Sequence, residues 1–316
     1  MDYRKLVCMV SAGIVSTVLF VGGANAAAPF AATPAPGYYR MLLGDFEVTA
    51  LSDGTLQMPH AALLTHVKQA QLQQALRRSF VTDPVTTSVN GFLINTGAKL
   101  VLVDTGTGAA GGATLGKLLS NLKASGYQPE QVDEVYITHM HGDHIGGLLA
   151  GDSAAFPNAI VRADAREAAY WLSEQNMNSA APDRRESFQR AMAVFKPYLA
   201  AGHFKTFEGD AELVPGIRSV ATYGHTPGHA NYVVESSGEK LVLWGDLMHS
   251  AAVQFADPAV TIKFDSDPVA AAAQRRKAFA DTARGGYWVG AAHLPFPGLG
   301  HLGAEGRGYR WVPAGP

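Results

Sequence analysis

Apolar residues recur along the chain with two different spacings. Stretches rich in Val, Ile, Leu and Tyr predict strands, and apolar residues three and four positions apart predict amphipathic helices. The predicted strands are 38–51, 86–95, 99–103, 132–137, 159–163, 232–234, 240–244 and 287–291, and 287–291 is expected to be the last one. Two further short strands are expected to start at 204 and 217, and a turn is predicted at 52–54. The predicted helices are 65–80, 114–125, 165–175, 184–201 and 269–284.

One short sequence pattern occurs twice. Gly-Ala-Lys-Leu-Val-Leu at 97–102 recurs as Gly-Glu-Lys-Leu-Val-Leu at 238–243. An acidic residue follows shortly after each copy, Asp104 after the first and Asp246 after the second. The echo predicts two related halves that pack sheet to sheet with helices outside, an α+β arrangement. Both halves then deliver polar residues to loops at strand ends, where a shared site can form.

The first 26 residues have the pattern of a secretory signal peptide. Arg4 and Lys5 precede an apolar run, and Ala24-Asn25-Ala26 supplies a small-residue cleavage site. We expect a flexible tether at 27–36 and one hydrolase domain at 37–316. The single cysteine, Cys8, lies in this leader, so the mature chain is expected to have no disulfide or thiolate ligand. These features predict a periplasmic or secreted protein.

Composition and charge argue against a disordered chain and against a nucleic-acid-binding protein. With 47% hydrophobic and 16% charged residues, the chain is globular, and its formal charge of −2 does not attract nucleic acid. The basic clusters at 77–78, 184–185 and 275–277 are interpreted as solvated helix faces. We therefore expect a small-molecule partner, no nucleic acid, and no membrane contact once the signal peptide is removed.

Potential metal ligands are most closely spaced in the run Thr-His-Met-His-Gly-Asp-His at 138–144, which follows the predicted strand 132–137. His139 and His141 are two apart and project to one side, whereas Asp143 and His144 follow Gly142, where the chain can turn. Imidazole and carboxylate are the usual ligands of zinc-like ions, so this run predicts two metal ions. The alternative is a polar loop that is rich in histidine by chance.

Three later residues, each just past a predicted strand, complete a set of seven metal ligands. The full set is His139, His141, Asp143, His144, His225, Asp246 and His293.

This order of motifs resembles the metallo-β-lactamase superfamily. The segments 37–46, 99–106 and 293–298 look like the methyl parathion hydrolase branch and its lactone-hydrolysing, dihydrocoumarin hydrolase-like relatives. The resemblance implies an αββα sandwich of two mixed β-sheets packed face to face. It also implies a dinuclear site with His139, His141 and His225 on one ion, Asp143, His144 and His293 on the other, and Asp246 bridging. His229 is then a supporting residue, and a homodimer is expected.

Two dications in such a site favour hydrolysis. Together they lower the pKa of a shared water enough to supply hydroxide near neutral pH, and zinc is the expected metal, with Mn, Co or Fe as alternatives. Asp143, Asp246 and His249 are the predicted catalytic residues. A Ser-His-Asp site would need a Gly-x-Ser-x-Gly turn, and the chain has none.

The predicted substrate pocket combines aromatic and apolar residues with one histidine. It contains Trp171, Phe188, His249, Ile262 and Phe264. His249 follows Asp246 by three positions, and in similar lactonases a tyrosine at the matching place donates to the lactone carbonyl. The small residues at 109–112 replace a bulky aromatic of the organophosphate branch. Both features favour an aromatic lactone or aryl ester, with organophosphate triesters as side substrates.

Several alternatives stay open. Four alternative activities fit the superfamily that the sequence resembles: organophosphate hydrolase, acyl-homoserine lactonase, glyoxalase-II-like thioesterase and iron dioxygenase. A β-lactamase is disfavoured because that class lacks a bridging acid where Asp246 stands. From a different class, the chain could be a metal-stabilised binding module without turnover.

Overall fold

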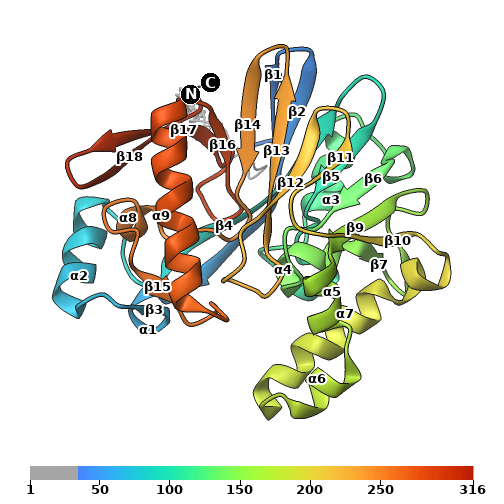
Figure 1. Cartoon of the computed structure of the whole chain (residues 1–316), viewed down its shortest axis with the longest axis horizontal. Helices are drawn as coiled ribbons and strands as arrows, with labels where there is room; N and C mark the ends of the chain where they lie inside the picture. The colour runs from blue at the N-terminus through green and yellow to red at the C-terminus, as the bar shows by residue number, and fades with distance from the viewer. Residues whose placement is uncertain (1–34, 316) are drawn as a thin grey trace, which may run out of the picture. The chain divides into compact units, whose positions relative to one another are not determined.

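The computed structural model of the protein describes residues 35–315 (Figure 1). The predicted signal peptide at 1–26 and all but the last two residues of the predicted tether lie outside the described residues.

The first sheet has seven strands and is mixed. Its order is β1-β2-β4-β5-β6-β9-β10, antiparallel from β1 to β5 and parallel from β5 to β10. The strands are β1 (Tyr38–Leu43), β2 (Phe46–Met58), β4 (Val85–Asn95), β5 (Leu100–Val103), β6 (Glu134–Tyr136), β9 (Ile160–Asp164) and β10 (Phe204–Phe207).

The second sheet also has seven strands, in the order β11-β12-β13-β14-β16-β17-β18. Adjacent strands in this sheet are antiparallel, except that β14 and β16 are parallel to each other. The strands are β11 (Ala211–Val214), β12 (Ile217–Ala221), β13 (Ala230–Ser236), β14 (Glu239–Leu243), β16 (Trp288–Gly290), β17 (Leu299–Glu305) and β18 (Gly308–Pro313). Two small ladders pair β3 (Leu64–Thr65) with β15 (Thr261–Ile262) and β7 (Leu149–Ala150) with β8 (Ser153–Ala154).

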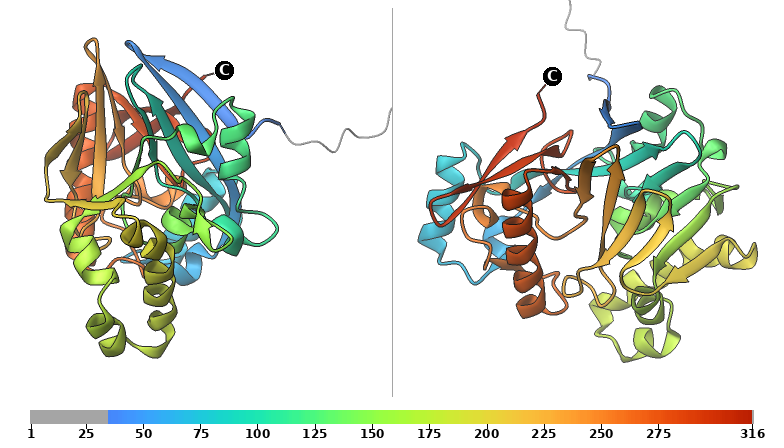
Figure 2. Two further views of the ribbon diagram at one scale, coloured as in Figure 1. Left: turned by 90° about the vertical axis from the view of Figure 1, so that its right-hand side faces the viewer. Right: turned by 45° about the horizontal axis from the view of Figure 1, so that its top comes forward.

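Side chains that alternate along the strands define the layers. Phe92 and Ile94 on β4 belong to the same core between the two sheets as Tyr232 on β13, whereas Leu93 faces a second core under helices. Val233 faces a third core on the outside of the second sheet. Because neighbouring residues of a strand point to opposite faces, each sheet buries both of its faces. The two sheets lie face to face in Figure 2.

Helices cover the outer faces of both sheets. Helices α3, α5 and α7 contribute to the core outside the first sheet, and α9 covers the second. The helices are α1 (His60–Leu63), α2 (Gln69–Arg78), α3 (Leu118–Ala124), α4 (Gly142–Ile145), α5 (Ala165–Trp171), α6 (Glu174–Ser179), α7 (Pro182–Ala200), α8 (Ala251–Gln254) and α9 (Pro268–Gly285), with short 3₁₀ turns η1 (Gly108–Gly111), η2 (Pro129–Gln131) and η3 (Gly146–Leu148). The architecture is the predicted α+β, αββα sandwich.

The predicted turn at 52–54 is wrong. Strand β2 continues through these residues with a register shift against β4, and Gly54 takes φ of +123°, which a bulge tolerates. Asp53 is buried there, and its carboxylate accepts hydrogen bonds from the amides of Thr107 and Leu118, both at 3.0 Å. That contact occupies an amide at the start of α3, which begins at Leu118 rather than at the predicted 114.

The strand predicted as the last one is followed by a hairpin. β16 occupies Trp288–Gly290, and β17 and β18 then extend the second sheet. The exposure of β18 explains why the apolar pattern did not indicate a strand there.

Arg275 corrects the interpretation of 275–277 as a solvated helix face. It is fully buried on α9, and its guanidinium donates to the backbone oxygens of Leu247 and Val260. Periodicity within one helix did not indicate which basic residue faces inward.

Between residues 35 and 315, no helix is both long and apolar enough to cross a membrane.

Candidate metal centre

The predicted ligands come from loops at one edge of the sandwich. Strands β12, β14 and β16 run in the same direction, so the residues that follow them leave the second sheet at the same edge. His225, Asp246 and His293 follow these strands. The segment after β6 brings His139 and His141 to the same place, and α4 carries Asp143 and His144. All seven predicted ligands meet there in two groups.

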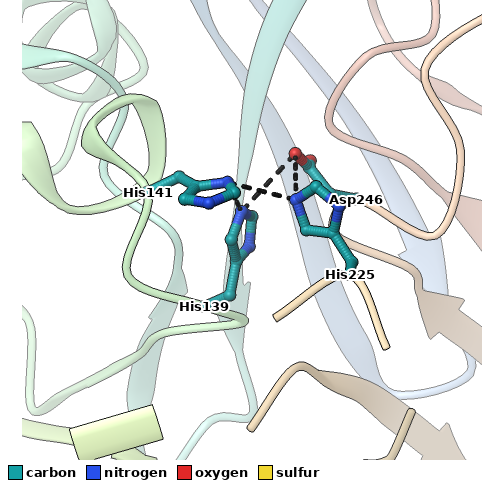
Figure 3. Close-up of side chains that lie close together, drawn as sticks. All are labelled: His139, His141, His225 and Asp246. Atoms are coloured by element: carbon teal, nitrogen blue, oxygen red, sulfur yellow. Dashed lines mark hydrogen bonds and ion pairs between the residues drawn. The ribbon is translucent and has the colours of Figure 1, made fainter. Parts of the chain in front are cut away.

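The first group contains four inward-pointing side chains, drawn in Figure 3. Nδ1 of His141 lies 3.0 Å from Nε2 of His139 and 3.1 Å from Nε2 of His225. Oδ2 of Asp246 lies 3.5 Å from Nε2 of His139 and 3.3 Å from Nε2 of His225. Four potential ligand atoms therefore surround one point.

The second group shares Asp246 with the first. Oδ1 of Asp246 lies 3.1 Å from Nε2 of His144 and 3.1 Å from Nε2 of His293. Oδ2 of Asp143 lies 3.7 Å and 3.5 Å from the same two nitrogens. The two carboxylate oxygens of Asp246 thus face one group each.

Hydrogen bonds on the outer side of the rings orient these histidines. In four of the five histidines the outer nitrogen faces an oxygen acceptor, so it carries the proton and leaves a lone pair on the inner nitrogen. The pairs are His139 Nδ1 with Thr138 Oγ1 (3.1 Å), His144 Nδ1 with Asp104 Oδ2 (2.8 Å), His225 Nδ1 with Asp265 Oδ1 (2.9 Å) and His293 Nδ1 with the backbone oxygen of Ser88 (3.0 Å).

The donor set fits divalent cations. Four ligand atoms placed tetrahedrally at about 2.1 Å from one ion lie about 3.4 Å apart, close to the spacings in the first group. Nε2 of His144 and Oδ1 of Asp246 are buried and have no hydrogen-bond partner within residues 35–315. Imidazole nitrogens and carboxylate oxygens that lie this close together in a buried cluster suit a divalent cation between them.

The buried groups shift one another's pKa values in both directions. Burial and the neighbouring His225 lower the pKa of His141 to about 3, which leaves a neutral ligand. Burial alone would raise the pKa of Asp246, but His144 and other imidazoles hold that pKa well below its usual range. Burial opposes the proton on His225, but hydrogen bonds to Asp246 and Asp265 raise its pKa to about 9. Metal binding at this group therefore displaces a proton.

Glu167 on α5 joins two ligand loops and was not found from the sequence. It is fully buried; Oε1 accepts from the amide of Met140 and Oε2 from the amide of Gly228, both at 2.8 Å. Met140 lies between two histidines of the first group, and Gly228 lies in the loop of His225. The apolar spacing of 165–175 marked only a helix, so only the contact across the loops identifies this residue.

Asp265 and Arg275 form a second support that was not found from the sequence. Asp265 orients His225, and its Oδ2 lies 3.9 Å from the buried guanidinium of Arg275. The same guanidinium donates to the backbone oxygen of Leu247, next to Asp246. One arginine of α9 thus holds the segments behind two ligands.

His229 has the contacts of a supporting residue. Its Nε2 accepts from the amide of Asp246 at 3.1 Å, and its Nδ1 lies 2.8 Å from Oγ1 of Thr222. Both nitrogens are used in these bonds, which agrees with the expectation that His229 is not a ligand.

A cavity of about 430 Å³ opens onto the two groups. Its wall comes from β2, the segment near α1, α5, α7 and the loops that carry the ligands. Residues that line it besides ligands are Leu56, Gln57, Met58, Pro59, Leu63, Gly142, Trp171, Arg184, Ser187, His249, Phe264 and Ser266. Of the predicted pocket residues, Trp171, His249 and Phe264 are on this wall.

Two predicted pocket residues are not on the wall. Phe188 is buried behind Trp171, with ring centroids 4.8 Å apart. Ile262 is buried in a separate core with Leu64 and Leu72. Residues 109–112 also do not line the cavity, so their small size does not widen it. Sequence position alone did not separate the pocket wall from the layer that supports it.

His249 lies at the boundary between the metal ligands and the cavity. Its Nε2 is 3.1 Å from Oδ2 of Asp246, and its ring stacks on His293. Its backbone amide donates to Oε1 of Gln254 at 2.7 Å, which fixes the loop.

The fold and the cluster together define an αββα sandwich with a histidine- and aspartate-rich centre at one edge. The chain belongs to the metallo-beta-lactamase superfamily, whose family model matches residues 85–297.

Individual proteins of known structure resemble most of the chain. The crystal structure of AbOPH, a hydrolase in the beta lactamase superfamily, is 39% identical and superposes with a TM-score of 0.85 over 90% of this chain and 99% of that chain. AidC, a dizinc quorum-quenching lactonase, is 27% identical with a TM-score of 0.82 over 88% of this chain and 98% of its own.

A curated relative is the N-acyl homoserine lactonase of Bacillus cereus, which is 30% identical over 161 residues. The match covers 51% of this chain and 56% of that relative, so the chain spans about half the length of the curated relatives it matches.

Proposed function

We propose that the protein is a metal-dependent hydrolase of lactones and aryl esters. The observation that carries the proposal is the position of Asp246, whose two oxygens each face a separate group of ligand atoms. His139, His141 and His225 would hold one cation, and Asp143, His144 and His293 would hold the other. Asp246 has one oxygen next to each group and would serve both cations.

The bound cations supply a water of lowered pKa as nucleophile and Lewis acidity for the carbonyl oxygen of the substrate. The chain supplies the geometry for this chemistry. Asp104 and Asp265 keep the outer nitrogens of His144 and His225 protonated, so that the inner nitrogens stay available as ligands. Zinc is the proposed metal, because the donor set suits it and the similar AidC is dizinc.

His249 is the proposed residue that positions the substrate. It borders both Asp246 and the cavity, where an N–H can donate to a carbonyl oxygen or to the departing oxygen of the ester. A phenol leaving group, with a pKa near 10, needs little further acid assistance. Asp143 and Asp246 act in catalysis through the ions that they hold.

The substrate class follows from the wall of the cavity. Leu56, Met58, Trp171 and Phe264 form an apolar surface suited to an aromatic ring next to a carboxylic ester. We propose an aromatic lactone of the dihydrocoumarin type as the main substrate, methyl parathion-like triesters as side substrates, and a relationship to methyl parathion hydrolase.

An acyl-homoserine lactone is the second candidate. The lactonase AidC resembles this chain over most of its length, and this observation favours the candidate independently of the pocket. We further propose a homodimer that is exported to the periplasm or secreted after cleavage of residues 1–26.

The test compares hydrolysis rates on protein of measured metal content. The substrates are dihydrocoumarin, phenyl acetate, an acyl-homoserine lactone and methyl paraoxon. We expect kcat/KM to be highest for dihydrocoumarin with two metal ions per chain. Highest activity on the homoserine lactone would favour the second candidate. No turnover of any ester by fully loaded protein would refute the hydrolase, and one iron with oxygen consumption would replace it by a dioxygenase.

A further inference from the structure

The wall of the cavity at the metal centre carries one charged side chain that the proposed hydrolysis does not use. Among residues 35–315, Arg184 is the one Asp, Glu, Lys or Arg on this wall that is not a predicted metal ligand. It lies in the first turn of α7, and Ser187 follows three positions later on the same face of the helix. Both side chains therefore border the space in which the substrate would lie.

Arg184 differs from the neighbouring arginines of α7 because its charge is unpaired. Arg185 donates to the backbone oxygen of Ala180 at 3.1 Å, and Arg190 pairs with Glu186 at 3.0 Å. Neither of these arginines lines the cavity. The side chain of Arg184 makes no hydrogen bond or ion pair within residues 35–315. The charge pattern grouped Arg184 and Arg185 as one solvated helix face, whereas their contacts separate them.

The rest of the wall offers an apolar surface and few unpaired polar groups. Leu56 and Trp171 supply apolar area, and Gln57 donates to Oγ1 of Thr86 at 3.0 Å. The hydroxyl of Ser187, by contrast, has no hydrogen-bond partner in the described part of the chain. A guanidinium and a hydroxyl on one helix face beside an apolar wall suit a ligand with an aromatic body and a carboxylate.

We propose that Arg184 determines specificity for substrates that carry a carboxylate in addition to the ester or lactone that is hydrolysed. Ser187 is a second donor to the same carboxylate. The inference rests on the proposed function for the reaction and narrows its substrate class to aromatic esters or lactones with an anionic substituent. Arg184 binds this substituent through charge-assisted hydrogen bonds while the ester lies at the metal centre. Dihydrocoumarin contains the reacting part of such a substrate but lacks the carboxylate.

The test compares aryl acetates that have nearly the same shape and differ in charge. They are 4-acetoxybenzoate and 4-acetoxybenzamide, together with their 3-substituted isomers. The measured quantity is the ratio of kcat/KM for the carboxylate to kcat/KM for the carboxamide, on zinc-loaded protein. For the isomer that wild type prefers, Arg184→Gln should lower this ratio about fivefold, as for an ion pair that water reaches. Differences between the leaving groups cancel, because every variant is compared on the same two substrates.

Arg185→Gln is the matched control. It removes the same charge one position along α7, from a side chain that does not line the cavity, so its ratio should equal that of wild type. Arg184→Lys keeps the charge and should retain most of the ratio. Added salt should lower the ratio in wild type and change it less in Arg184→Gln, because dissolved ions screen an exposed charge.

Equal ratios in wild type and Arg184→Gln, or equal losses in Arg184→Gln and Arg185→Gln, would overturn the inference, and hydrolysis of phenyl acetate would still uphold the proposed function. If the protein hydrolyses no aryl ester, the proposed function fails instead. Equilibrium dialysis against 4-hydroxybenzoate and 3-hydroxybenzoate then measures binding without turnover. Weaker binding by Arg184→Gln than by Arg185→Gln would support the carboxylate site, and equal affinities would overturn it. Arg184 is exposed, so its substitution should leave folding intact.

Discussion

The carboxylate of Asp265 accepts a hydrogen bond from Nδ1–H of His225 at 2.9 Å, although 40 positions separate the two residues in the chain. The bond sets which nitrogen of His225 faces the centre. Asp265 is also close to the buried Arg275, so its charge is balanced on the side away from the metal site. Such contacts link the folding of the second sheet to the affinity of the centre.

Asp265→Asn should lower metal affinity at the first group. The amide is a weaker acceptor and can turn its NH2 toward the ring, so the lone pair on Nε2 is less well oriented. Loss of such an outer partner typically costs about 10–100-fold in metal affinity. Zinc competition with a chromophoric chelator measures the change, and Asp257→Asn, an exposed residue of the same segment, is the control. An unchanged dissociation constant would remove Asp265 from the support of the site.

Glu167→Gln should loosen both ligand loops. One carboxamide oxygen can accept from only one side, so the NH2 group meets the amide of Met140 or Gly228, at a cost of about 1–3 kcal/mol in the free energy of unfolding. Urea unfolding of metal-free protein measures this loss. Glu174→Gln, exposed at the start of α6, should leave the stability unchanged.

The Glu167 side chain also predicts a pH dependence. Burial raises its pKa above the usual value of 4.5, so the folded state holds the proton more tightly than the unfolded state. Wild type therefore loses stability from this group as the pH rises from 4.5 through the folded pKa, and the advantage of wild type over Glu167→Gln should shrink over that range. A constant difference across the range would contradict the assignment.

Chelation should remove activity and stability together. Without cations, the buried cluster keeps polar atoms that have no hydrogen-bond partner within residues 35–315, among them Nε2 of His144 and Oδ1 of Asp246. At a thousandfold excess of free cation over its dissociation constant, each ion stabilises the fold by about 4 kcal/mol. Thermal unfolding should shift down after dialysis against EDTA and recover with two equivalents of zinc. Recovery of full activity with a single equivalent would argue against a bridging role for Asp246.

His249→Ala should reduce lactone turnover while both metal ions remain bound. Removal of one donor that is aimed at developing negative charge costs about 100-fold in kcat. Rates with dihydrocoumarin, alongside metal content, provide the measurement. His203→Ala, at a histidine that does not line the cavity at the metal centre, serves as the control. Equal turnover by wild type and His249→Ala would exclude His249 from the reaction.

Much of the fold was predictable from residue patterns. The strands around 86–103 and 230–243 and the helix from Pro268 follow alternation, turn residues and the Asp267 cap, all of which act over a few neighbouring positions. The gathering of the seven predicted ligand residues at one place was predictable as well, because closely spaced His and Asp residues directly after strands are typical of metal sites.

Tertiary structure alone decided which residues support that set and which line the cavity. Glu167, Asp265 and Arg275 look like ordinary helix or loop residues in the sequence, and only their contacts across the fold reveal what they hold. Phe188 and Ile262 match the pocket in residue type but lie one layer behind it. The physical reason is the separation along the chain over which each property is set. Periodicity and metal-ligand spacing depend on neighbouring residues of one segment, whereas burial and hydrogen-bond partners depend on which distant segments the two sheets bring together.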